Sequence, residues 1–156
     1  MKKVFVTLVV LITALFISAS AFYGQGKAKT GPDPSTIRDA DLEKDSLHNL
    51  EVARHYFKLK KAYVAAIRRC EEIDAGNPNF AKMDEVLYIA GESSLRLAGN
   101  LGKQKTKERT PEQLRQDARV YLSRLVAGYP NSGFYKEAEA DLQALGGPIK
   151  PEGGKQ

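Results

Sequence analysis

The chain has 156 residues, a formal net charge of +5 at pH 7, 42% hydrophobic residues and 28% charged residues. These values suit one globular domain, and they exclude a collagen-like, a largely disordered and a multi-span membrane protein. The single cysteine, Cys70, excludes an intramolecular disulfide and a cysteine-based zinc cluster. With two histidines, the chain has little material for metal binding or acid–base catalysis.

The N-terminus has the three parts of a secretory signal. Residues 1–3 include two lysines, residues 4–17 are apolar, and residues 18–21 are small. This order predicts a signal peptide over residues 1–21 that is cleaved after Ala21, and therefore an exported protein. An uncleaved N-terminus that anchors the chain in the inner membrane is the alternative interpretation.

Two segments beyond this signal are rich in glycine and proline. Residues 22–45 predict a flexible linker, and residues 146–156 predict a disordered tail. The expected folded domain is therefore residues 46–145.

Every periodic segment of this domain has the 3.6-residue spacing of an α-helix, and none alternates as a strand does. The expected fold is all-α, with five short antiparallel helices, of which the second to the fifth end at glycine or proline. Thr110 is a suitable N-cap for the fourth helix, with Pro111 at the first helical position. The apolar faces are Leu47, Leu50, Ala53 and Phe57; Tyr63, Ala66, Ile67, Cys70 and Ile73; Met83, Val86, Leu87, Ala90 and Leu97; Leu114, Ala118, Tyr121, Leu122 and Leu125; and Tyr135, Ala138, Leu142 and Leu145.

The second and fourth helices repeat one pattern. Twelve residues separate Ala66 from Pro78, and twelve separate Ala118 from Pro130. A small alanine allows two helices to approach closely, and a proline ends the helix and turns the chain. The remaining repeat positions are Leu50, Ala53, Phe57, Tyr63, Leu87, Ala90, Gly91 and Leu122.

These positions resemble the tetratricopeptide repeat, which is a pair of antiparallel helices. The run from Tyr121 to Leu145, with Tyr129-Pro130-Asn131-Ser132 at its centre, resembles the BamD family of outer-membrane protein assembly factors and the related YbgF/CpoB-type periplasmic repeat proteins. The resemblance covers residues 46–145 and implies a short α-solenoid with about two and a half repeats. It also implies a non-enzymatic scaffold or adaptor in the bacterial envelope, located in the periplasm or at the outer-membrane periphery.

The partners that this resemblance implies are envelope proteins or peptides, β-barrel assembly components among them. In tetratricopeptide proteins the first helix of each hairpin lines a concave groove that holds a partner peptide. Alignment by the motif predicts that the groove is lined by His48, Glu51, His55, Lys58, Glu85, Tyr88, Glu92 and Arg96. This mixture of charges with one aromatic ring suits a peptide better than a catalytic centre.

We expect no catalytic residue, cofactor or metal ligand. Cys70 lies on an apolar helix face, which favours a buried structural thiol. His48, Glu51 and His55 share one helix face, but no further metal ligand is visible. A periplasmic metal-binding protein or enzyme remains an alternative, as do a YbgF/CpoB-like coordinator of cell-wall maintenance and a self-assembling homo-oligomer.

The insertion between the third and fourth helices carries a basic run made of Lys103, Lys105, Lys107 and Arg109. One interpretation is a solvated loop. The other is a weak contact with anionic lipid headgroups or with an acidic partner. Nucleic acid is not an expected partner, because the chain has an export signal and the run contains no aromatic residue.

Overall fold

The computed structural model describes residues 39–149. Its α-helices are α2 (Ala40–Arg54), α3 (Tyr63–Gly76), α4 (Met83–Ala98), α5 (Pro111–Gly128) and α6 (Tyr135–Ala144), and a short π-helix, η2 (His55–Lys60), continues α2. The described residues contain no strand, so the expected all-α fold with five α-helices is confirmed. The predicted signal peptide, most of the predicted linker and residues 150–156 lie outside the described residues.

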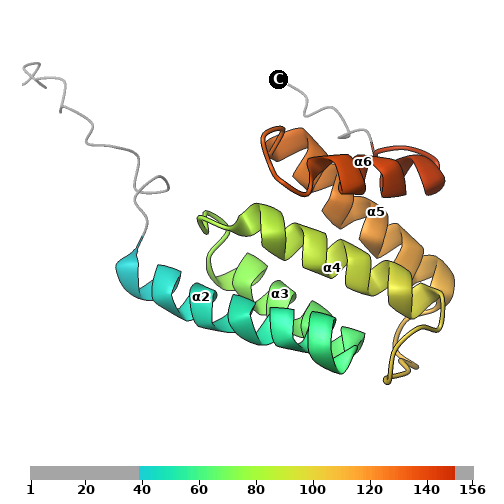
Figure 1. Cartoon of the computed structure of the whole chain (residues 1–156), viewed down its shortest axis with the longest axis horizontal. Helices are drawn as coiled ribbons and strands as arrows, with labels where there is room; N and C mark the ends of the chain where they lie inside the picture. The colour runs from blue at the N-terminus through green and yellow to red at the C-terminus, as the bar shows by residue number, and fades with distance from the viewer. Residues whose placement is uncertain (1–38, 150–156) are drawn as a thin grey trace, which may run out of the picture. The chain divides into compact units, whose positions relative to one another are not determined.

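Each helix packs against the next one along the chain. α2 packs on α3, α3 on α4, α4 on α5, and α5 on α6, while α2 also contacts α4. Figure 1 shows successive antiparallel helices, with α4 between the α2–α3 hairpin and the α5–α6 pair. This sequential packing is that of a short array of helical hairpins.

The first helix begins at Ala40, six residues before the start of the predicted domain. The reason is an N-cap: Asp39 Oδ1 accepts hydrogen bonds from the backbone N–H groups of Asp41 (2.8 Å) and Leu42 (3.3 Å). The acidic residues Asp41 and Glu43 in the first turn also favour a helix N-terminus there. The predicted linker over residues 22–45 therefore overlaps the first six residues of α2.

The folded domain also extends past residue 145. The Arg119 Nε donates to the Gly147 carbonyl (2.6 Å), and the Ile149 backbone N–H donates to Ser123 Oγ (2.9 Å). Both bonds tie the segment after α6 back to α5. Residues 146–149 therefore belong to the domain, in contrast to the predicted start of the disordered tail.

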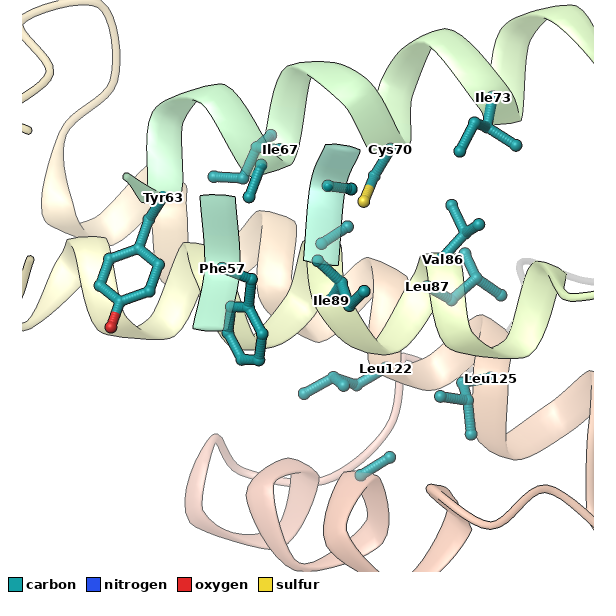
Figure 2. Packing of buried hydrophobic residues seen from close by; sticks show 14 of the residues in the cluster. Phe57, Tyr63, Ile67, Cys70, Ile73, Val86, Leu87, Ile89, Leu122 and Leu125 are labelled. Carbon is teal, nitrogen blue, oxygen red and sulfur yellow. The ribbon is translucent and has the colours of Figure 1, made fainter. Parts of the chain in front are cut away.

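Most of the predicted repeat positions lie in the core, together with other apolar side chains of the same helices. Side chains of Ile67, Cys70 and Ile73 from α3 point toward α4, and Leu122 and Leu125 of α5 lie on its other side (Figure 2). Burial raises the pKa of the Cys70 thiol, so this group is an unreactive part of the core. Of the repeat positions, those that are buried are Leu50, Ala53, Phe57, Tyr63, Ala66, Leu87, Ala90, Gly91, Ala118 and Leu122, whereas Pro78 and Pro130 are exposed at the turns after α3 and α5.

The closest approach between α4 and α5 occurs at Gly91. A Cβ atom at this position would lie 2.7 Å from both Cγ and Cδ2 of Leu122. Leu122 is fully buried, so it has no free space into which to move. The absence of a side chain at Gly91 therefore sets how closely α4 and α5 pack.

We expect Gly91→Ala to destabilise the protein by about 1–2 kcal/mol, because overpacking at Leu122 exceeds the gain in helix propensity of about 1 kcal/mol. Urea denaturation measures this change. The control is Gly128→Ala at the end of α5, where nothing lies within 4 Å of the added Cβ atom. A gain in stability from both substitutions would contradict the close-approach explanation.

Ser93 and Ser94 of α4 are both fully buried, but their hydroxyl groups differ. Ser94 Oγ donates to the Ala90 carbonyl (2.8 Å), whereas Ser93 Oγ has no hydrogen-bond partner within the described residues. An unsatisfied buried hydroxyl costs free energy. We expect Ser93→Ala to raise the free energy of unfolding by about 1 kcal/mol.

Thermal and urea denaturation of the two single alanine variants measure this difference. Ser94→Ala loses a satisfied hydrogen bond and should bring no comparable gain. Equal effects of the two substitutions would show that the unpaired hydroxyl is not the cause.

Candidate functional site

Side chains of α2, α4 and α6 meet on one side of the domain, which we call the α2/α4/α6 face. Its contacts run from α2 to α4 and from α4 to α6. It comprises Glu51, Arg54 and Lys58 from α2 and η2, Glu85, Tyr88, Glu92 and Arg96 from α4, and Glu137 and Asp141 from α6.

A two-pronged ion pair joins α2 to α4. Arg54 Nε and Nη2 donate to the two carboxylate oxygens of Glu85 at 2.6 and 2.5 Å. This hydrogen bond lowers the pKa of the Glu85 carboxyl and raises the pKa of Arg54. The Arg54 and Glu85 side chains are 30% and 15% exposed, so the pair is partly shielded from solvent, and its two-pronged geometry fixes both side chains.

A stacked pair of aromatic rings joins α4 to the start of α6. The rings of Tyr88 and Phe134 are 4.6 Å apart between centroids, with an angle of 17° between their planes. The Tyr88 hydroxyl donates to Glu137 Oε2 at 2.6 Å. Burial, followed by this hydrogen bond, raises the pKa of Tyr88. Tyr88 therefore remains a neutral donor and holds α6 against α4.

Arg96 connects the acidic and aromatic parts of the face. Its Nε and Nη2 donate to Glu92 Oε2 at 2.9 and 2.7 Å. Its guanidinium carbon also lies 4.8 Å from the Phe57 ring centroid and 5.9 Å from that of Tyr63. These cation–π contacts place Arg96 over the end of the first hairpin.

Asp141 of α6 lies beside Glu92 of α4. Burial, followed by a hydrogen bond to Glu92, raises the pKa of the Asp141 carboxyl to about 6. The negative charge of Glu92 makes ionisation of Asp141 less favourable, because like charges repel at short distance. With Glu137 nearby on α6, this part of the face is acidic.

The structure brings together only some of the residues predicted for the groove. Glu85, Tyr88, Glu92 and Arg96 lie together on α4, as the motif alignment predicted. From α2, it is Arg54 that reaches α4. His48 lies six residues before Arg54, which turns it about 120° around the helix. Four predicted groove residues are exposed: His48, Glu51, His55 and Lys58.

Three residues of the face were missed by the sequence reasoning. Arg54 occupies the place where the tetratricopeptide pattern has glycine. Glu137 and Asp141 belong to the fifth helix, which the motif alignment treated as a cap. The signal that could have found them is their charge opposite the polar side of α4.

No described group of three or more His, Cys, Asp or Glu side chains is placed to hold a metal ion. A cavity of about 110 Å³ lies between α3, α5 and the α4–α5 loop. More open hollows of about 280–310 Å³ lie elsewhere on the described surface.

The α4–α5 loop is tied to α3. The Arg109 guanidinium donates to Glu71 (2.7 Å) and Asp117 (3.2 Å), and the Gln104 side-chain oxygen accepts from the Ala65 N–H (3.2 Å). The hydrogen bond to Glu71 raises the pKa of Arg109. Arg109 thus anchors the loop. Since its charge is paired with Glu71 and Asp117, it is not available to a partner as the other residues of the predicted basic run are.

No protein-family model, curated protein or solved structure matches this chain. Among residues 39–149, no helix has both the length and the apolar composition that crossing a membrane requires.

We expect Asp141→Asn to stabilise the protein by about 1 kcal/mol at about pH 7.5 and by little at about pH 4. The folded protein holds the Asp141 proton more tightly than the unfolded chain, because the folded pKa is raised to about 6. The free energy of unfolding of the wild-type protein therefore falls as pH rises from about 4 through about 6 and the Asp141 carboxyl ionises. Asparagine removes this loss.

Urea denaturation of both proteins across this pH range measures the effect. Glu139→Gln, at an exposed position of α6, is the control for a lost negative charge. A difference between Asp141→Asn and wild type that does not change with pH would contradict the shared environment of Asp141 and Glu92.

Proposed function

We propose that the protein is an exported, non-enzymatic adaptor of the tetratricopeptide type, which binds a protein or peptide of the bacterial envelope on its α2/α4/α6 face. The observation that carries this proposal is that α2 and α6 each hold a polar side chain of α4 in place. Arg54 of α2 fixes Glu85, and Glu137 of α6 fixes Tyr88.

A fixed surface of this kind favours partner binding, because its side chains lose little conformational entropy when a partner docks. The face also leaves polar groups for a partner. Glu51 and Lys58 are exposed at its α2 edge, and Glu92, Glu137 and Asp141 make its α6 side acidic. A peptide with basic side chains complements that side.

The more specific part of the proposal is a role in outer-membrane protein assembly, like that of the BamD family. Its support is the motif around the α5–α6 turn. Ser132 Oγ donates to Asp84 of α4 (2.7 Å) and accepts from the Phe134 backbone N–H (3.2 Å). The motif residue therefore joins the turn to α4 and places Phe134 under Tyr88.

The test is photo-crosslinking in cells with a photoreactive amino acid at Glu51 or Lys58. The control position is Gln116, which is exposed on α5. We expect an envelope protein to be captured from the face and not from Gln116. A β-barrel assembly component supports the specific role, and cell-wall or division proteins overturn it in favour of another envelope process. Capture of the same proteins from all positions overturns the face as the binding site.

A charge reversal at the edge of the face should change partner capture. We expect Lys58→Glu to increase capture from Glu51 several-fold, because the added negative charge attracts the basic side chains of a partner that complements the face. Lys136→Glu on α6 is the matched control, since it makes the same change at another exposed lysine. Circular dichroism confirms that both variants fold, and equal capture by both would contradict a role for Lys58.

A further inference from the structure

Two segments far apart in the sequence form one exposed end of the domain, which we call the lysine–leucine tip. It consists of Leu59, Lys60 and Lys61 from the end of η2, and of Leu101, Lys103, Lys105 and Lys107 from the α4–α5 loop. Figure 1 shows that the α2–α3 turn and the α4–α5 loop lie at the same end of the helices.

Backbone contacts hold the two segments together. The Lys103 N–H donates to the Lys61 carbonyl at 3.0 Å. Gly102 has φ +93°, and a Cβ atom there would lie 2.6 Å from the Lys61 carbonyl oxygen and from the Tyr63 ring. The loop therefore packs directly on the α2–α3 turn. This contact fixes the position of Lys103, the first lysine of the loop, beside Lys61.

Two leucines are exposed at the tip. Leu59 is 70% exposed and Leu101 is 57% exposed, and each lies two residues from the bond between Lys61 and Lys103. The end of η2 explains the position of Leu59. The Ala62 N–H reaches back to the Tyr56 carbonyl (2.9 Å) and Lys61 adopts a left-handed conformation with φ 51°, so the helix stops without covering Leu59.

The lysines of the tip carry charge that no acidic side chain of residues 39–149 pairs with. Lys60, Lys61, Lys103, Lys105 and Lys107 are exposed, and the structure pairs none of them with an acidic side chain within the described residues. The one acidic residue of the loop, Glu108, lies 3.3 Å from Arg68. The two segments of the tip therefore carry five exposed lysines and two exposed leucines.

We propose that the lysine–leucine tip docks on the surface of an anionic phospholipid bilayer, with the leucines between the headgroups and the lysines on their phosphates. Charge alone would suit any acidic surface. Exposed leucines beside lysines match the boundary between headgroups and acyl chains, where both kinds of side chain are stabilised. The proposal does not depend on the identity of the partner on the α2/α4/α6 face.

The test measures the fluorescence of a label attached to the tip, which reports whether that position enters a lipid bilayer. The full chain carries Leu101→Cys labelled with the fluorophore NBD, and native labelling is confined to this position because Cys70 is buried. A second protein carries the label at Gln143→Cys, an exposed position of α6. Each protein is mixed with vesicles of phosphatidylcholine alone, or of equal parts phosphatidylcholine and phosphatidylglycerol.

We expect the emission of the Leu101 label to shift to the blue on the anionic vesicles and not on the neutral ones, and to be quenched by brominated lipid. The Gln143 label should show neither effect. A local probe is needed because residues 4–17 are apolar and would bring the whole chain to any vesicle. An unchanged Leu101 spectrum, or an equal shift on both kinds of vesicle, overturns the proposal.

A pair of triple variants separates the tip from net charge. Lys103→Gln with Lys105→Gln and Lys107→Gln should weaken the response to anionic vesicles about a hundredfold, as expected for three lysines near a charged bilayer. Lys44→Gln with Lys82→Gln and Lys136→Gln removes the same charge elsewhere and should leave the response unchanged. Equal losses, or a response to polyglutamate but not to vesicles, overturn the proposal, the latter in favour of an acidic protein partner.

Discussion

The contact between Gly91 and Leu122 is the constraint on which the rest of the domain depends. It sets how closely α4 approaches α5, and α4 is the helix that packs on both α3 and α5. Because α4 packs on α3 and α5 with its apolar sides, its polar side is left to meet α2 and α6. The α2/α4/α6 face is thus a consequence of how the core packs, and its geometry is as rigid as the core.

Ion pairs between charged side chains then set the relative positions of elements that the apolar core alone does not determine. Arg54 joins α2 to α4, Arg109 joins the α4–α5 loop to α3, and Arg124 of α5 binds Asp74 of α3 through two hydrogen bonds of 2.6 and 2.7 Å. Each pair connects elements far apart in sequence. Partly exposed pairs contribute little to stability individually, so their main effect is to set the relative positions of the helices.

The sequence predicted the fold well because the relevant signals are local. Apolar positions recur at helical spacing, and glycine or proline follows α3, α4, α5 and α6, so the helices could be recognised one by one. The start of α2 was missed because the N-cap Asp39 is a single residue beside a segment rich in glycine and proline. The π-helix η2 was not predictable, since nothing in the residues 55–60 alone requires the wider turn.

The candidate site was harder to predict because it depends on contacts between helices. Motif alignment placed Glu85, Tyr88, Glu92 and Arg96 together because they share one face of α4. It could not show that Arg54 reaches Glu85, or that Asp141 lies beside Glu92, since both contacts depend on the packing distance between helices. Residue spacing therefore identifies a helix face, whereas the partners of that face follow from tertiary structure.

The α2/α4/α6 face and the lysine–leucine tip have no residue in common, although both contain part of η2. Lys58 belongs to the face through its interaction with Glu85, while Leu59 and Lys60 belong to the tip. The change of direction at the end of η2 separates them. Side chains of the tip could therefore contact a bilayer while those of the face hold a partner. Since Phe57, Tyr63 and Gly102 pack together beneath both surfaces, the orientation of one surface relative to the other is set by the core.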